Sequence, residues 1–86
     1  MDRKSQHSEK NNEIRFPFEE VFARIASVLS IRSQVELAEV LAVKQSVISD
    51  AKRRNGIPLA WLLKLRDLHG INPDWLAEGT GPTHLR

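Results

Sequence analysis

Two stripes of apolar residues lie so close together between Gln34 and Arg53 that only a tight turn can separate the helices they predict. In this segment, QVELAEVLAVKQSVISDAKR, the apolar positions recur at helical spacing on both sides of a short interruption. Ala38 provides a small side chain inside the first helix, where a second helix can approach closely. The pattern is typical of a helix-turn-helix that runs from about Ser33 to Arg54.

Proline, glycine and capping residues divide the rest of the chain into three further helices. The first covers about residues 17–29, and another covers residues 58–70, where a glycine stops it. A short helix, residues 74–78, follows the cap Asn72 and ends at Gly79. No stretch shows sustained alternation of apolar and polar residues, so the expected fold class is all-α, a compact five-helix bundle without a sheet.

The chain has 86 residues, which is enough for one domain. Residues 1–16 are polar and lack apolar periodicity, so we expect a flexible N-terminal tail there. Residues 17–79 are expected to form the helical domain. Residues 80–86 are expected to form a C-terminal tail or the start of a linker.

Several side chains are expected to cap helices or to face the core. Ser33 and Glu36 have the spacing of a capping box at the start of the second helix. The third helix should end at Asn55-Gly56, with Gly56 in the left-handed conformation. Trp61 and Trp75 are expected in the core rather than stacked on a ligand. The other inward residues are expected to be Val47, Ile48 and Ala51 in the third helix and Leu59, Leu62, Leu63, Leu65 and Leu68 in the fourth.

Composition excludes several classes of protein. The absence of cysteine removes disulfides, thiolate catalysis and cysteine-ligated zinc, and it favours an intracellular protein. No apolar run has the length of a membrane span or the form of a secretory signal. The three histidines lack metal-ligand spacing, and no serine lies in a nucleophile motif. We therefore expect no enzymatic activity, no cofactor, no metal and no membrane partner.

The formal net charge is only +2, but the basic residues concentrate in one segment. Between residues 44 and 54 there are four basic residues and a single acid, Asp50, whereas acids outnumber basic residues between 18 and 43. Such a concentration is typical of a surface that meets phosphate groups. An ordinary solvated helix face remains the alternative.

The outward face of the third helix carries short polar side chains. Ser46, Ser49 and Asp50 lie opposite its apolar side, and Gln45 lies at its N-terminal tip. In a major groove, glutamine can pair with adenine and a carboxylate can accept a hydrogen bond from cytosine. The carboxylate could instead hold a neighbouring arginine in position. Phosphates would pass near the ends of the helix, which carry Lys44, Arg53, Arg54 and Asn55.

The segments LAEVLAVKQSVISD, IPLAWLLKL and GINPDWLAEGTGP together resemble the N-terminal domains of phage CI-type repressors, within the lambda-repressor-like helix-turn-helix superfamily. The resemblance runs from Phe18 to Pro82. Its most specific part is the capped short helix that carries a tryptophan before a glycine-rich exit. The resemblance implies a transcriptional repressor of lysogeny that binds a palindromic double-stranded DNA operator as a dimer, with the third helix in the major groove. By position, it implies base reading by Gln45, Ser46 and Asp50, with Ser49 adjacent, and a phosphate contact at Gln34.

Repressors of this family commonly carry a C-terminal domain for dimerisation and, in many members, self-cleavage. We therefore expect the chain to be the N-terminal fragment of a longer repressor. It would be a homodimer on DNA or through that further domain, in the bacterial cytoplasm. The alternative is a protein-interaction module of the antitoxin type on the same helical fold. Serines and basic groups on the third helix, in place of apolar residues, favour DNA.

Two positions depart from the family pattern. Ala42 occupies the turn position that glycine usually holds, at a cost of about 1 kcal/mol if the backbone there is left-handed. Lys44 stands where a serine or threonine usually caps the third helix. Because lysine cannot accept the backbone hydrogen bond, the first N–H groups of that helix are left to water or to a phosphate.

Overall fold

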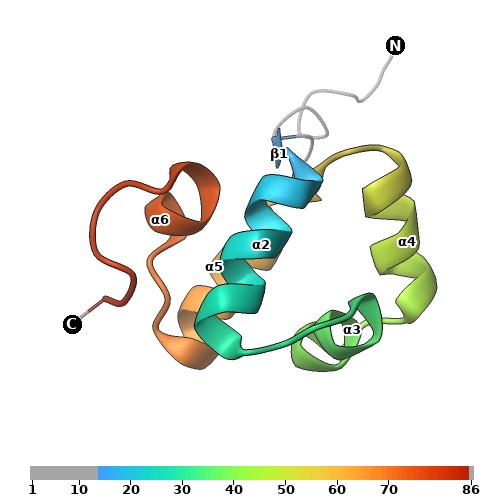
Figure 1. Ribbon diagram of the computed structural model, residues 1–86, viewed down its shortest axis with the longest axis horizontal. Coiled ribbons are helices and arrows are strands. Elements are labelled where there is room, and N and C mark those ends of the chain that lie inside the picture. The colour runs from blue at the N-terminus through green and yellow to red at the C-terminus, as the bar shows by residue number, and fades with distance from the viewer. Residues whose placement is uncertain (1–13, 86) are drawn as a thin grey trace, which may run out of the picture.

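Five short helices surround one core in residues 14–85, the part of the chain that the structure, a computed structural model, describes (Figure 1). The predicted all-α fold with its helix-turn-helix is confirmed. Of the tail expected at residues 1–16, residues 1–13 lie outside the described residues. In chain order, the elements are β1 (Arg15–Phe16), α2 (Phe18–Leu29), α3 (Gln34–Leu41), α4 (Gln45–Arg53), β2 (Ile57–Pro58), α5 (Leu59–His69) and α6 (Pro73–Glu78).

Helix α2 lies in the middle of the molecule in front of α5, with α3 and α4 on one side and α6 on the other (Figure 1). Helix α3 packs mainly against α4, and α6 packs against α2 and α5. Trp61 is buried, as expected, and Trp75 packs half-buried against the core. The buried apolar residues are Phe18, Val21, Ile25, Leu37, Ala38, Leu41, Ile48, Ala51, Ile57, Trp61, Leu62, Leu65, Ile71 and Leu76.

The predicted helix caps are present. The Ser33 hydroxyl accepts a hydrogen bond from the Glu36 N–H at 3.2 Å, and the Asn72 side chain accepts one from the Asp74 N–H at 3.0 Å. Gly70 and Gly79 end α5 and α6 in the left-handed conformation. The helices are therefore short because capping groups and left-handed residues stop them.

A small sheet corrects the expectation of a purely helical fold. Strand β1 pairs antiparallel with β2, Arg15 opposite Pro58 and Phe16 opposite Ile57. The Leu59 N–H also donates to the carbonyl of Ile14 at 3.1 Å. Strands of two residues are too short to show alternation, so residues 14–16 looked like part of the tail. They are instead joined to the start of α5.

The end of α4 differs from its prediction in which residue takes the left-handed conformation. Asn55 has a φ of +54°, and Gly56 does not have a positive φ. Asparagine adopts the left-handed conformation more readily than most residues, so this conformation can occur at Asn55, one position before the predicted Gly56. At Gly56 a Cβ atom would lie 2.8 Å from the Arg15 Cδ and 3.1 Å from the Arg15 Cβ, so a larger residue there would require the Arg15 side chain to shift.

Two residues expected in the core are exposed, Val47 at 41% and Leu68 at 55%. Helix α4 buries only the pair Ile48 and Ala51, three positions apart, and Val47 lies about 100° around the helix from Ile48. Leu68 lies in the last turn of α5, where the neighbouring helices no longer cover it. Both residues occur at helical spacing, but the face of each helix that packs against the core is narrower than the apolar face that the sequence predicts.

The segment after α6, expected to leave the domain, folds back onto it. The Asn72 amide nitrogen Nδ2 donates to the Pro82 carbonyl at 2.9 Å, and the Asn72 N–H donates to the Thr83 carbonyl at 2.8 Å. The Leu85 N–H donates to the Gly70 carbonyl at 2.7 Å. Residues 82–85 therefore run beside residues 70–72 and are part of the ordered structure.

Candidate nucleic-acid interface

The turn between α3 and α4 is held by backbone geometry and by a side chain from outside the motif. Ala42 is left-handed, with φ +59° and ψ +44°, and its N–H donates to carbonyls of the last turn of α3. The Val43 N–H donates to the Ala38 carbonyl at 3.0 Å. Lys64 of α5 donates through its Nζ to the carbonyl of Leu41, the last residue of α3. The turn thus keeps the geometry usual for glycine although it contains alanine.

Helix α4 is fixed to the domain by one side and by its C-terminal end. Ile48 and Ala51 bury that side against the core. At the end of the helix, the Asn55 Oδ1 accepts a hydrogen bond from the Phe18 N–H at 3.1 Å. Asn55, for which a phosphate contact is expected, joins α4 to the first residue of α2 through its side-chain oxygen.

The opposite side of α4 is polar and accessible. Gln45, Ser46 and Ser49 are exposed, and Asp50 is half-buried. Lys44 is exposed at the N-cap and makes no side-chain hydrogen bond to the helix start, as its chemistry predicts. Because α4 has no side-chain cap, its positive dipole end is open to an anion.

A shallow hollow lies where the N-terminal ends of α3 and α4 meet. Gln34 and Gln45, expected to contact phosphate and base, line this same hollow. Arg32 also lines it, although this arginine lies in the part of the chain where acids outnumber basic residues. Its position directly before the Ser33 cap was the available signal, since helix N-termini attract anions. The complete lining is Phe22, Arg32, Ser33, Gln34, Val35 and Gln45.

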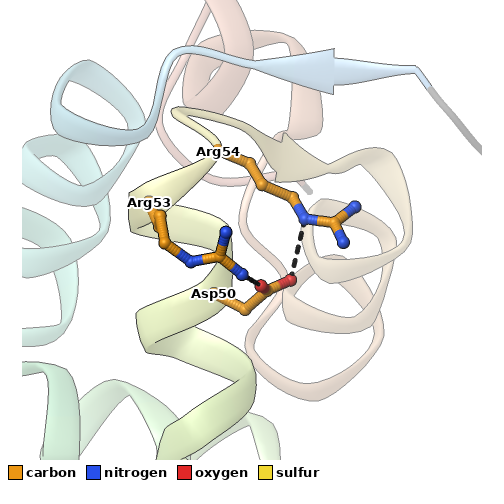
Figure 2. Close-up of polar contacts among 3 residues, drawn as sticks. All are labelled: Asp50, Arg53 and Arg54. Atoms are coloured by element: carbon orange, nitrogen blue, oxygen red, sulfur yellow. Dashed lines mark hydrogen bonds and ion pairs between the residues drawn. The ribbon is translucent and has the colours of Figure 1, made fainter.

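At the other end of α4, one carboxylate holds two arginines (Figure 2). Arg53 pairs through its Nη2 with the Asp50 Oδ1, and the Arg54 Nε lies 3.0 Å from the Asp50 Oδ2. Lys52 points to a different acid, with its Nζ 4.0 Å from the Glu19 Oε2. The side chains of Arg53 and Arg54 remain mostly exposed despite these contacts.

A family model described as the bacteriophage CI repressor helix-turn-helix domain matches residues 20–84. The chain belongs to this family. The resemblance seen in the sequence is thereby confirmed, and the CI repressor family is one of DNA-binding regulatory domains, which are typically not enzymatic. No curated protein and no solved structure matches the chain.

As expected of a CI repressor helix-turn-helix domain, α3 and α4 form the pair that the sequence pattern predicts. The expected site residues fall into two groups along α4. Lys44, Gln45 and Ser46 lie at its N-terminal end, beside Gln34 of α3, and Asp50, Arg53, Arg54 and Asn55 lie at its C-terminal end, with Ser49 between the two groups.

In residues 14–85 no three histidine or acidic side chains are grouped so that they could hold a metal ion. No helix in that part of the chain is long and apolar enough to cross a membrane.

Proposed function

We propose that this CI repressor domain is a sequence-specific transcriptional repressor that inserts α4 into the major groove of double-stranded DNA. The observation that carries the proposal is the exposed polar face of α4, with an uncapped N-terminus at one end and cationic residues at both ends. Short side chains let a helix backbone come close to base edges, and serine is among the permissive readers of bases.

The proposed role of each residue in DNA binding follows from its position along α4. Gln45 lies at the tip that would enter the groove first, and its amide can form two hydrogen bonds with adenine. Ser46 and Ser49 lie on the same exposed face and would contact base edges next to it. Gln34 and Arg32, in the hollow beside Gln45, would receive a phosphate of the backbone.

The remaining phosphate contacts would come from Lys44 at the start of α4 and from Arg53 and Arg54 at its end. For Asn55 we propose at most a contact through its Nδ2, since its Oδ1 is bonded to Phe18. Two copies would bind a palindromic operator as a dimer, with half-sites about one helical turn apart. In a longer repressor, a C-terminal domain would supply further dimer contacts in the bacterial cytoplasm.

Selection of binding sites from random duplex DNA, followed by titration, tests this proposal. Gln45→Ala and Ser46→Ala should each lower affinity for the selected sequence, with a loss of about 1–3 kcal/mol for Gln45→Ala if its paired bonds to adenine are removed. Affinity for mixed-sequence DNA should hardly change. Ser27→Ala is the matched control, because Ser27 is an exposed serine on α2.

The proposal is refuted if the domain does not bind duplex DNA at low salt. It is also refuted if Gln45→Ala and Ser46→Ala select the parent sequence with the parent affinity, as Ser27→Ala should.

A further inference from the structure

Asp50 lies in the segment of the domain where a negative charge is hardest to explain. It is on the proposed DNA-facing side of α4, one turn before the two arginines that it holds. Each of its carboxylate oxygens takes one guanidinium group, as Figure 2 shows. A carboxylate near DNA is repelled by the phosphates, so its presence at this place calls for a reason.

Stability of the fold does not supply that reason. Arg53 and Arg54 are already favourably placed at the C-terminal end of α4, where the helix dipole attracts cations. The paired side chains are 73% and 57% exposed for Arg53 and Arg54, and exposed ion pairs contribute little to stability. Asp50 makes no other ion pair in the part of the chain that the structure describes.

The contact instead resembles the one that the two arginines would make with DNA. Arginine binds carboxylate and phosphate groups with the same planar arrangement of N–H donors. While both guanidinium groups hold Asp50, neither can offer those donors fully to a phosphate. The three side chains together carry a formal charge of +1 instead of +2.

We propose that Asp50 is a specificity-determining residue that competes with DNA phosphates for Arg53 and Arg54. This inference rests on the proposed function of α4. On a wrong sequence, α4 gains no base contacts, and the arginines stay largely with Asp50. On the operator, contacts of Gln45 and Ser46 with base edges fix the backbone in register, and the arginines exchange the carboxylate for phosphate. Asp50 therefore weakens non-specific binding more than specific binding.

The size of the effect follows from the two ion pairs. Breaking two exposed pairs of ordinary strength corresponds to a change of about two- to thirtyfold in affinity. Asp50→Asn keeps the shape of the side chain and removes the charge. It should raise the affinity for mixed-sequence duplex DNA by that factor at low salt. It should also steepen the salt dependence, by up to about 0.9 in the log–log slope for each arginine freed to bind phosphate.

Asp67→Asn is the matched control, because it removes one exposed carboxylate that pairs with Arg66 on α5 and not on α4. A double-mutant cycle supplies the second control. Asp50→Asn is repeated in the background Arg53→Gln with Arg54→Gln, where the gain in non-specific affinity should disappear. Affinity for the selected operator should rise less than affinity for mixed-sequence DNA, so the ratio of the two should fall.

The outcomes separate this inference from the proposed function. A gain for Asp50→Asn no larger than that for Asp67→Asn, or one that persists without the two arginines, overturns the inference. Loss of affinity for the operator together with relaxed preference at one base pair identifies Asp50 as a base reader and also overturns it. In both cases the domain still binds DNA. If neither the parent nor Asp50→Asn binds duplex DNA at low salt, the proposed function itself fails.

Discussion

Replacing Ala42 with glycine should stabilise the domain, although the same change in a helix destabilises it. Ala42 has φ +59° and is exposed, so its methyl group strains the backbone without contributing to the core. The left-handed conformation costs a residue with a Cβ atom about 1–2 kcal/mol, and glycine removes that cost. Glycine also makes the unfolded chain more flexible, which lowers the free energy of unfolding by about 0.4–1 kcal/mol. The midpoints of these two ranges leave a net gain of about 0.8 kcal/mol, with a rise in the melting temperature of about 3–6 °C.

Ala23→Gly is the matched control for Ala42→Gly, since Ala23 is exposed in the interior of α2. It should lower the free energy of unfolding by about 1 kcal/mol, through loss of helix propensity. Thermal and urea unfolding of both variants measure the difference between them, about 1.5–2 kcal/mol. If Ala42→Gly lowers the stability as Ala23→Gly does, the alanine is not strained in the native turn, and the reasoning from its backbone angles is wrong.

Two further comparisons test the packing and the C-terminal contacts by urea unfolding. Ile48→Ala should lower the free energy of unfolding by about 2–5 kcal/mol because Ile48 is fully buried, whereas Val47→Ala should change it by at most about 0.5 kcal/mol. Equal losses would place Val47 in the core after all. Asn72→Ala should lower it by about 2 kcal/mol, through loss of the α6 cap and of the bond to the Pro82 carbonyl. Asn72→Ser keeps an acceptor for the cap but is too short to reach the Pro82 carbonyl, so it should lose about half as much; an equal loss would mean that the bond to Pro82 carries the stability.

Local signals in the sequence were sufficient to predict most of the helices and their ends. Ser33 and Asn72 carry side chains whose chemistry favours caps, and the structure contains both capping hydrogen bonds. Gly70 and Gly79 end helices for an equally local reason, since they adopt a positive φ at no steric cost. In the candidate site, the strain at Ala42 and the missing cap at Lys44 were predicted by comparison with the family pattern, which has glycine and a serine or threonine at these positions.

Features that depend on distant residues could not be predicted. The β1–β2 pair joins residues 15–16 to residues 57–58, and neither strand is long enough to show a pattern. The packing of residues 82–85 against residues 70–72 depends on Asn72, whose amide nitrogen donates to the Pro82 carbonyl. A capping motif predicts only that the Asn72 side chain accepts a hydrogen bond, so it does not predict this second contact. The exposure of Val47 depends on how narrow a face α4 packs against the core, and periodicity gives the direction of that face but not its width.

The orientation of α4, on which the proposed function depends, is set partly by residues outside the helix-turn-helix. Lys64 of α5 binds the carbonyl at the end of α3, and the backbone of Phe18 in α2 binds the Asn55 side chain just after α4. Helices α3 and α4 pack mainly against each other, and α4 buries only two side chains, so these two bonds help to fix the pair on the rest of the bundle. A helix-turn-helix pattern therefore predicts which helix meets DNA. The orientation of that helix is set by contacts throughout the bundle. Substitutions at Lys64 or Asn55 are therefore expected to change DNA binding by changing this orientation, without removing a direct contact with DNA.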